Sequence, residues 1–228
     1  MSRSSLVLGF VLLGAAGCAP DTASSRLIAP RNPSAITYGS VDASNTYANV
    51  GAFIVTRKSN GHISPICSGT LISPTVFLTA GHCTAYFATL SPSEYAAGVS
   101  FANPIAWGDL TDPNAKVIPA ISVITNPEYN QRQSDPADLG VLILSSNDTQ
   151  GIAAAALPTL GLLDHLFAAG TLLSTRFTGV GYGLQNRVVG GGLPYFQDLN
   201  PIPRMYSSSS FNALGPAYLR LSQNPATG

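Results

Sequence analysis

His82 and Asp138 are the two residues of this chain whose types and surroundings suit proton transfer. His82 follows a run of apolar and small residues and directly precedes Cys83. Asp138 stands at the head of the apolar run 139–144, where a carboxylate is unusual because burying it without a partner is costly. An imidazole beside Asp138 would be such a partner, and an imidazole oriented by a carboxylate can act as a general base. Together the two residues indicate acid–base chemistry.

The segment before His82 is predicted to form a β-hairpin. Apolar and β-branched residues favour strands at 69–72 and 76–79, and Ser73-Pro74 between them favours a turn. A turn of small residues after the second strand is expected to present the imidazole. Further strands are expected at 50–56, 117–124, 139–144 and 217–222.

Both residues also have purely structural interpretations. His82 could be a hydrogen-bonded histidine beside a structural disulfide, and Asp138 could cap the turn that follows Pro136. A metal site made of Cys67, His82 and Cys83 is a poorer interpretation. It offers three ligands, two of them adjacent in sequence, whereas structural zinc takes four at wider spacing. We therefore expect no metal.

The sequence around both residues resembles the trypsin-like serine proteases of the chymotrypsin fold. Residues 67–83 match the histidine loop of that family: a cysteine, Ser-Gly-Thr-Leu-Ile, a turn, and Leu-Thr-Ala-Gly-His-Cys. Asp138-Leu-Gly-Val-Leu is close to the family's Asp-Ile-Ala-Leu-Leu, and Asn126-Pro-Glu-Tyr-Asn resembles its His-Pro-x-Tyr-Asn. Residues 178–183 resemble Val-Thr-Gly-Trp-Gly with tyrosine in place of tryptophan. The resemblance covers about residues 36–228.

This resemblance implies an all-β fold of two antiparallel six-stranded barrels, the second of them incomplete. The first barrel is expected within residues 36–150 and the partial second one within 151–228. A disulfide between Cys67 and Cys83 is implied, and closing a loop of that size contributes about 3 kcal/mol in the chain-entropy model. His82 would be general base and then general acid, with Asp138 as its orienting partner, and activity is expected to fall below about pH 6.5.

The sequence lacks the nucleophilic serine that the resemblance requires. In the family template that serine follows the aspartate by about 90 residues within Gly-Asp-Ser-Gly-Gly, and no such motif occurs in this chain. Ser222 and the run 207–210 lack the glycine-flanked turn that exposes a nucleophile and aims backbone N–H groups at an oxyanion. We expect a serine endopeptidase truncated before that motif, so that this chain itself is inactive. The alternative is a non-catalytic protease-like β-barrel, an exported binding module or lipoprotein.

The N-terminus has the features of an export signal. Arg3 precedes the apolar run 6–16 and the small-residue zone Gly17-Cys18-Ala19, and the run is too short to span a bilayer. Residues 1–19 are therefore interpreted as a signal peptide, which places the protein outside the cytoplasm where disulfides persist. Residues 15–18 resemble a bacterial lipobox, with alanine where leucine is preferred, so Cys18 is a candidate lipid attachment site. An ordinary cleaved signal is the alternative.

Residues 20–35 are predicted to be a linker or propeptide because they are polar and contain prolines. Ile36-Thr-Tyr-Gly resembles the family's Ile-Val-Gly-Gly, which implies Ile36 as a possible new N-terminus after activating cleavage. An ordinary entry strand without a processing role is the alternative.

The composition excludes several classes of partner. Charged residues are only 10% of the chain and the net charge is zero, so no basic surface for nucleic acid is expected. The glycines at 178–183 lack the spacing and lysine of a phosphate loop, and no cofactor is expected. A protein or peptide substrate is expected, with a monomeric chain that contacts membranes only through a lipid on Cys18.

Overall fold

The structure is a computed structural model. Cys18, Ile36 and the proposed signal and linker segments lie outside the residues that it describes. The described residues are 39–108, 116–132, 134–145, 149, 151–184, 186–188, 195–197 and 199–222.

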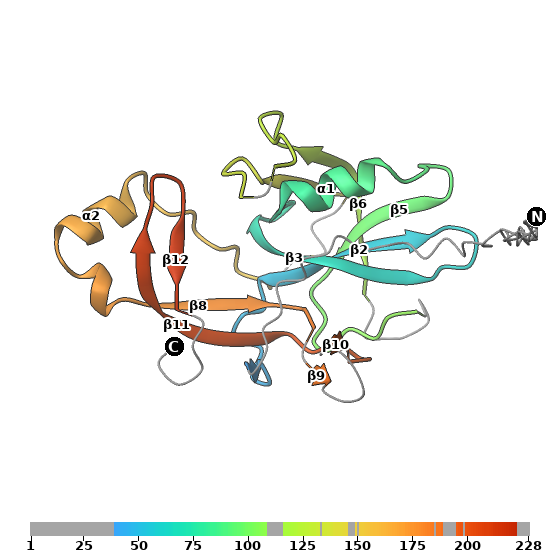
Figure 1. Cartoon of the computed structure of the whole chain (residues 1–228). Coiled ribbons are helices and arrows are strands. Elements are labelled where there is room, and N and C mark those ends of the chain that lie inside the picture. The colour runs from blue at the N-terminus through green and yellow to red at the C-terminus, as the bar shows by residue number, and fades with distance from the viewer. Residues whose placement is uncertain are drawn as a thin grey trace, which may run out of the picture.

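Six antiparallel strands close into a barrel in the first half of the chain (Figure 1). Neighbours around the barrel follow the order β2-β3-β4-β7-β6-β5. Their bounds are β2 (Val50–Arg57), β3 (Ile63–Ser73), β4 (Val76–Thr79), β5 (Tyr95–Ser100), β6 (Ile118–Thr125) and β7 (Gly140–Leu144).

The interior of the barrel is filled by apolar side chains from its different strands. Phe53, Leu71, Phe77, Val99 and Leu142 are all fully buried and belong to one cluster. Because successive side chains of a strand point to opposite faces, each strand supplies alternate residues to this core. The all-β prediction is therefore confirmed.

The hairpin before His82 is close to its predicted form. Strand β4 has the predicted bounds, whereas β3 begins at Ile63, because residues 63–67 also pair with β2. The turn predicted to present His82 is wrong: helix α1 (Gly81–Ala88) begins there instead. Small residues allow a tight turn, but they also allow the close packing that a helix start against β7 requires.

A second, partial sheet lies beside the barrel (Figure 1). Strand β11 (Met205–Leu214) is at the centre of this sheet and pairs with β8 (Arg176–Gly181), β1 (Ser40–Val41) and β12 (Leu219–Leu221), each of them antiparallel. Strands β9 (Asn186–Val188) and β10 (Tyr195–Gln197) form a separate antiparallel pair. Within the described residues these strands do not close into a second barrel.

Two short helices connect the barrel to the partial sheet. They are α2 (Leu162–Ala168) and the 3-10 helix η1 (Leu172–Ser174). In Figure 1, α2 lies at the far end of the molecule from β5. None of α1, α2 and η1 has the length and hydrophobicity of a membrane-spanning segment.

An apolar cluster joins the barrel to the partial sheet. Ala52, Ile54 and Ile63 of the barrel are fully buried in it together with Ile105. A backbone bridge pairs Ile105 with Ile202, which leads into β11. The two halves of the chain therefore share a buried interface.

Candidate active site

His82 and Asp138, separated by 56 positions in sequence, are in direct contact. The His82 Nδ1 atom lies 2.8 Å from Asp138 Oδ2, and the backbone N–H of His82 donates to Asp138 Oδ1 at 2.6 Å. The side chains are 39% and 33% exposed, so the pair lies at the surface with its contact partly shielded. One carboxylate thus holds both the ring and the backbone of the histidine.

The chemistry of the carboxylate assigns the proton of the imidazole. An ionised carboxylate only accepts hydrogen bonds, so Nδ1 of His82 must be the donor to Asp138. In a neutral ring the lone pair is then on Nε2. No hydrogen bond to Nε2 is present within the part of the chain that the structure describes. With its lone pair unused among the described residues, Nε2 is able to take a proton from a third group.

Helix α1 and the cystine fix the backbone at His82. Ala80, the residue before α1, provides no side-chain cap, so the first turn of the helix has N–H groups in need of acceptors. Asp138 supplies one acceptor from a distant strand end, where its negative charge also suits the helix N-terminus. The Cys67–Cys83 disulfide is present, as the family resemblance implied, and it ties the next residue to β3.

Glycine at position 81 allows the close approach of these elements. A Cβ atom there would lie 2.9 Å from the backbone oxygen of Leu139 and 3.2 Å from Asp138 Oδ1. Any larger residue would push α1 away from the carboxylate. The geometry of the pair therefore depends on a residue with no side chain at position 81.

Thr84 attaches the other side of α1 to the barrel. It is fully buried, and its hydroxyl donates to the backbone oxygen of Gly81 at 2.9 Å and lies 2.8 Å from Thr125 Oγ1 of β6. This contact was not predicted from the sequence. The one sign of it there is a threonine directly after Cys83.

Asp135 organises the loop that carries Asp138. Its side chain is only 8% exposed and accepts the backbone N–H groups of Asn130 at 2.7 Å and Ala137 at 2.9 Å. Its backbone oxygen accepts the N–H of Asp138 at 3.2 Å. Turn capping was the structural alternative for Asp138, and the structure gives that task to Asp135 instead.

Two tyrosines face the same carboxylates. Burial, followed by the charges of Asp138 and Asp135, raises the pKa of Tyr129. The pKa of Tyr218 is raised in the same direction by desolvation and by Asp135 and Asp138. The Tyr218 hydroxyl donates to the backbone oxygen of Ser134, so the turn between β11 and β12 contacts the loop of Asp138. Both phenols stay neutral beside the acid.

The neighbouring cysteines do not make a metal site. Ligand atoms of Cys67, His82 and Cys83 lie within 4.8 Å of one another, but the two sulfur atoms are bonded to each other. A metal would require thiolates, and Nδ1 of His82 is already held by Asp138. The donor set is that of a disulfide beside an acid–base pair.

Ser222 and the serines at 207–210, which lack the sequence setting of a nucleophile, take part in strand pairing. Residues 207–210 pair with β8, and the hydroxyls of Ser208 and Ser210 accept hydrogen bonds from Arg176. The backbone N–H of Ser222 donates to the oxygen of Ser210 at 2.9 Å.

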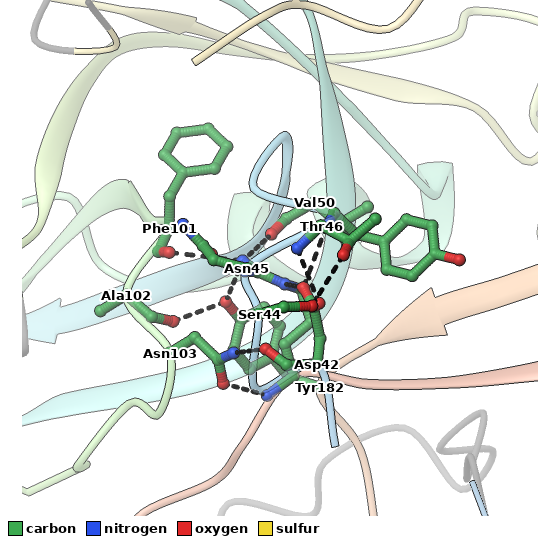
Figure 2. A network of polar contacts seen from close by, with 11 residues as sticks. Asp42, Ser44, Asn45, Thr46, Val50, Phe101, Ala102, Asn103 and Tyr182 are labelled. Carbon is green, nitrogen blue, oxygen red and sulfur yellow. Dashed lines mark hydrogen bonds and ion pairs between the residues drawn. The ribbon is translucent and has the colours of Figure 1, made fainter. Parts of the chain in front are cut away.

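A buried polar cluster lies where the N-terminal segment, the barrel and the partial sheet meet (Figure 2). Arg204 is fully buried and Asp42 is 1% exposed, and their Nε and Oδ2 atoms are 2.9 Å apart. Arg204 Nη1 donates to the Val50 oxygen at 3.0 Å and to Tyr182 Oη at 3.1 Å, and Nη2 donates to Asn45. Such a cluster is stable only because nearly every polar atom has a partner.

Burial alone would raise the pKa of the Asp42 carboxyl, but its hydrogen bonds act in the opposite sense. Arg204 donates to it, as do the backbone N–H groups of Tyr47 and Thr46. The pKa of Asp42 is thereby lowered from its ordinary 3.8. Burial also raises the pKa of Tyr182 to about 12, so its hydroxyl keeps its proton and donates it to the Ala102 oxygen at 2.6 Å.

A solved structure and a family model match parts of this chain. A collagenase structure has 15% sequence identity and a TM-score of 0.47, and the match covers 77% of this chain and 63% of the collagenase chain. This chain therefore spans less than two thirds of the length of that collagenase. None of the curated proteins compared with the chain matches it. The model of the trypsin family matches residues 40–189, well over half of the sequence, and the chain belongs to the trypsin family.

Proposed function

We propose that this chain carries the acid–base pair of a serine endopeptidase. The observation that supports the proposal most directly is the double contact of Asp138 with the ring and the backbone of His82. Nε2 of His82 would take the proton of a serine hydroxyl as that oxygen attacks the peptide carbonyl, and would then give the proton to the leaving amine. Asp138 would hold the required tautomer and stabilise the imidazolium.

The proposal also requires a nucleophile, and residues 1–228 do not contain the family's serine motif. Gly-Asp-Ser-Gly-Gly does not occur in residues 1–228, and the hydroxyls of Ser208 and Ser210 in β11 accept hydrogen bonds from Arg176. The described residues therefore offer a general base, and no serine hydroxyl among them is hydrogen-bonded to it. We expect no peptidase activity from this chain alone.

The decisive experiment begins with the nucleotide sequence beyond codon 228. If the reading frame continues into a glycine-flanked serine, the longer product is expected to hydrolyse a casein-like substrate and to react with a fluorophosphonate. His82→Ala should lower its kcat by about 10²-fold or more, since general-base catalysis contributes about 10²- to 10⁴-fold. Retained turnover in His82→Ala, or a reading frame without such a serine, would rule the proposal out.

A non-catalytic β-barrel is the second candidate. It is favoured by the absence of a serine hydrogen-bonded to His82 among the described residues. This candidate expects a reading frame that ends without the serine motif and a purified chain that is folded and soluble. It fails if the 228-residue product hydrolyses a protein substrate in a manner abolished by His82→Ala.

Export of the protein is a further part of the proposal. A trypsin-family domain with a disulfide fits an oxidising compartment. Metabolic labelling with a fatty acid would test Cys18, with Cys18→Ser as the control. Label that is lost in Cys18→Ser supports a lipoprotein, and unlabelled secreted protein supports a cleaved signal.

A further inference from the structure

Ser68 connects the barrel to the partial sheet with a single hydroxyl group. The backbone N–H of Tyr182 donates to Ser68 Oγ at 2.8 Å, and Ser68 Oγ donates to the backbone oxygen of Tyr182 at 3.1 Å. Ser68 belongs to β3, and Tyr182 directly follows β8. This reciprocal pair therefore joins a barrel strand to the end of a strand in the partial sheet.

On the barrel side, Ser68 belongs to the framework that holds His82. Its neighbour Cys67 is bonded to Cys83, the residue after His82. Its backbone oxygen accepts the hydroxyl of Thr79 at 2.8 Å, near the end of β4 and two positions before α1 begins. A displacement of Ser68 would therefore be transmitted directly to the imidazole.

On the other side, Tyr182 is held so that it cannot adjust independently. Its hydroxyl donates to the Ala102 oxygen and accepts from Arg204, whose guanidinium also bonds Asp42 and the Val50 oxygen (Figure 2). Arg204 directly precedes β11, the central strand of the partial sheet. The end of β8 and the start of β11 are thus both attached to Tyr182, the residue that bonds to Ser68.

We propose that Ser68 is a positioning residue: its hydroxyl sets the placement of the partial sheet relative to the cystine that holds His82. The consequence for catalysis rests on the proposed function. The geometric consequence does not depend on any activity. Removal of the hydroxyl should let the sheet shift against the barrel while both remain folded.

The test measures the distance between the two halves in the full chain. Nitroxide labels are placed at Ile121→Cys on β6 and Thr178→Cys on β8, both exposed strand positions, in a Cys18→Ser background that leaves no other free thiol. Double electron–electron resonance is recorded for Ser68→Ala and for Ser68→Thr, which keeps the hydroxyl. Ser73→Ala is the matched control, because Ser73 lies on the same strand and its hydroxyl has no hydrogen bond among the described residues.

The expected result is a narrow distance distribution in the parent chain that broadens and shifts in Ser68→Ala only. Ser68→Thr should restore it, and Ser73→Ala should leave it unchanged. An unchanged distribution in Ser68→Ala would overturn the proposal. If that variant does not fold, hydrogen exchange of the Tyr182 amide in the unaltered chain decides: exchange as slow as in β3 supports the proposal, and exchange at the rate of an exposed loop contradicts it.

The consequence for catalysis is measured separately, as kcat of a longer protein product that contains the nucleophilic serine. A misplacement of about 1 Å can cost about 10²-fold in rate, so Ser68→Ala should lower kcat by up to about 10²-fold with little change in KM. An unchanged kcat together with a shifted distance distribution would remove the catalytic half of the proposal. If no active product exists, the proposed function fails, while the resonance experiment still decides the role of Ser68.

Discussion

At the scale of single residues, the carboxylate of Asp138 holds both the backbone and the ring of His82. Oδ1 accepts the backbone N–H of His82, and Oδ2 accepts Nδ1–H of the ring. In Asp138→Asn the first contact can persist, but the amide NH₂ would donate to Nδ1 and move the ring proton to Nε2. Nitrogen NMR of the imidazole should therefore report a change of tautomer. The resonances of His62 and His165 serve as internal controls, and the same tautomer in both proteins would contradict the assignment.

At the scale of secondary-structure elements, the position of His82 depends on the packing of α1 against β7. A Cβ atom at Gly140 would lie 2.5 Å from Thr84 Oγ1, so Gly140→Ala must push the helix away from the strand that follows Asp138. We expect a loss of about 1–3 kcal/mol in the free energy of unfolding, measured in urea. Gly179→Ala in β8 is the matched control, because a Cβ atom there meets nothing within 4 Å. Equal effects of the two substitutions would contradict this account.

At the scale of the whole molecule, the Asp42–Arg204 pair joins three parts of the chain. Removal of one partner leaves a buried charge, so Asp42→Asn should lower the free energy of unfolding by about 3–5 kcal/mol, and the double variant with Arg204→Met should recover part of it. The exposed Arg176→Met is the control, with an expected loss of about 1 kcal/mol or less. A small effect of Asp42→Asn in urea unfolding would contradict the role of the pair.

Because the pKa of Asp42 is lowered on folding, its contribution to stability is complete above the ordinary value of 3.8 and is lost as the pH falls through the lower folded value. The parent chain should therefore lose more stability than Asp42→Asn as the pH falls below about 4. If the free energy of unfolding falls in parallel for the two proteins as the pH is lowered, this role of Asp42 is contradicted.

Tyr182 gives the molecule a dependence on alkaline pH with the opposite sign. Its pKa is raised from 10.0 to about 12, so the folded chain keeps a proton that the unfolded chain loses first. The stability from this group is complete below pH 10 and declines as the pH rises towards 12. Tyr182→Phe should have a shallower decline over this interval in urea unfolding. Identical slopes for the two proteins would show that the phenol does not contribute.

The sequence by itself determined the local parts of this protein. Strand β4 has its predicted bounds and β2 extends one residue further than predicted, because the preference of apolar and β-branched residues for strands acts locally along the chain. The contact of His82 with Asp138 was also predicted, because each residue lies in a short, recognisable motif. Where small residues gave no period, as at the start of α1, the predicted turn was wrong.

Only the tertiary structure decided the contacts between distant segments. Asp42 and Arg204 are 162 positions apart, and Ser68 and Tyr182 are 114 apart. No pattern along the chain pairs these residues, because their contact depends on which strand ends meet after the barrel has closed. A buried charge or hydroxyl is stable only where a partner is already in place, so such contacts are fixed by the assembled fold and not by any one segment.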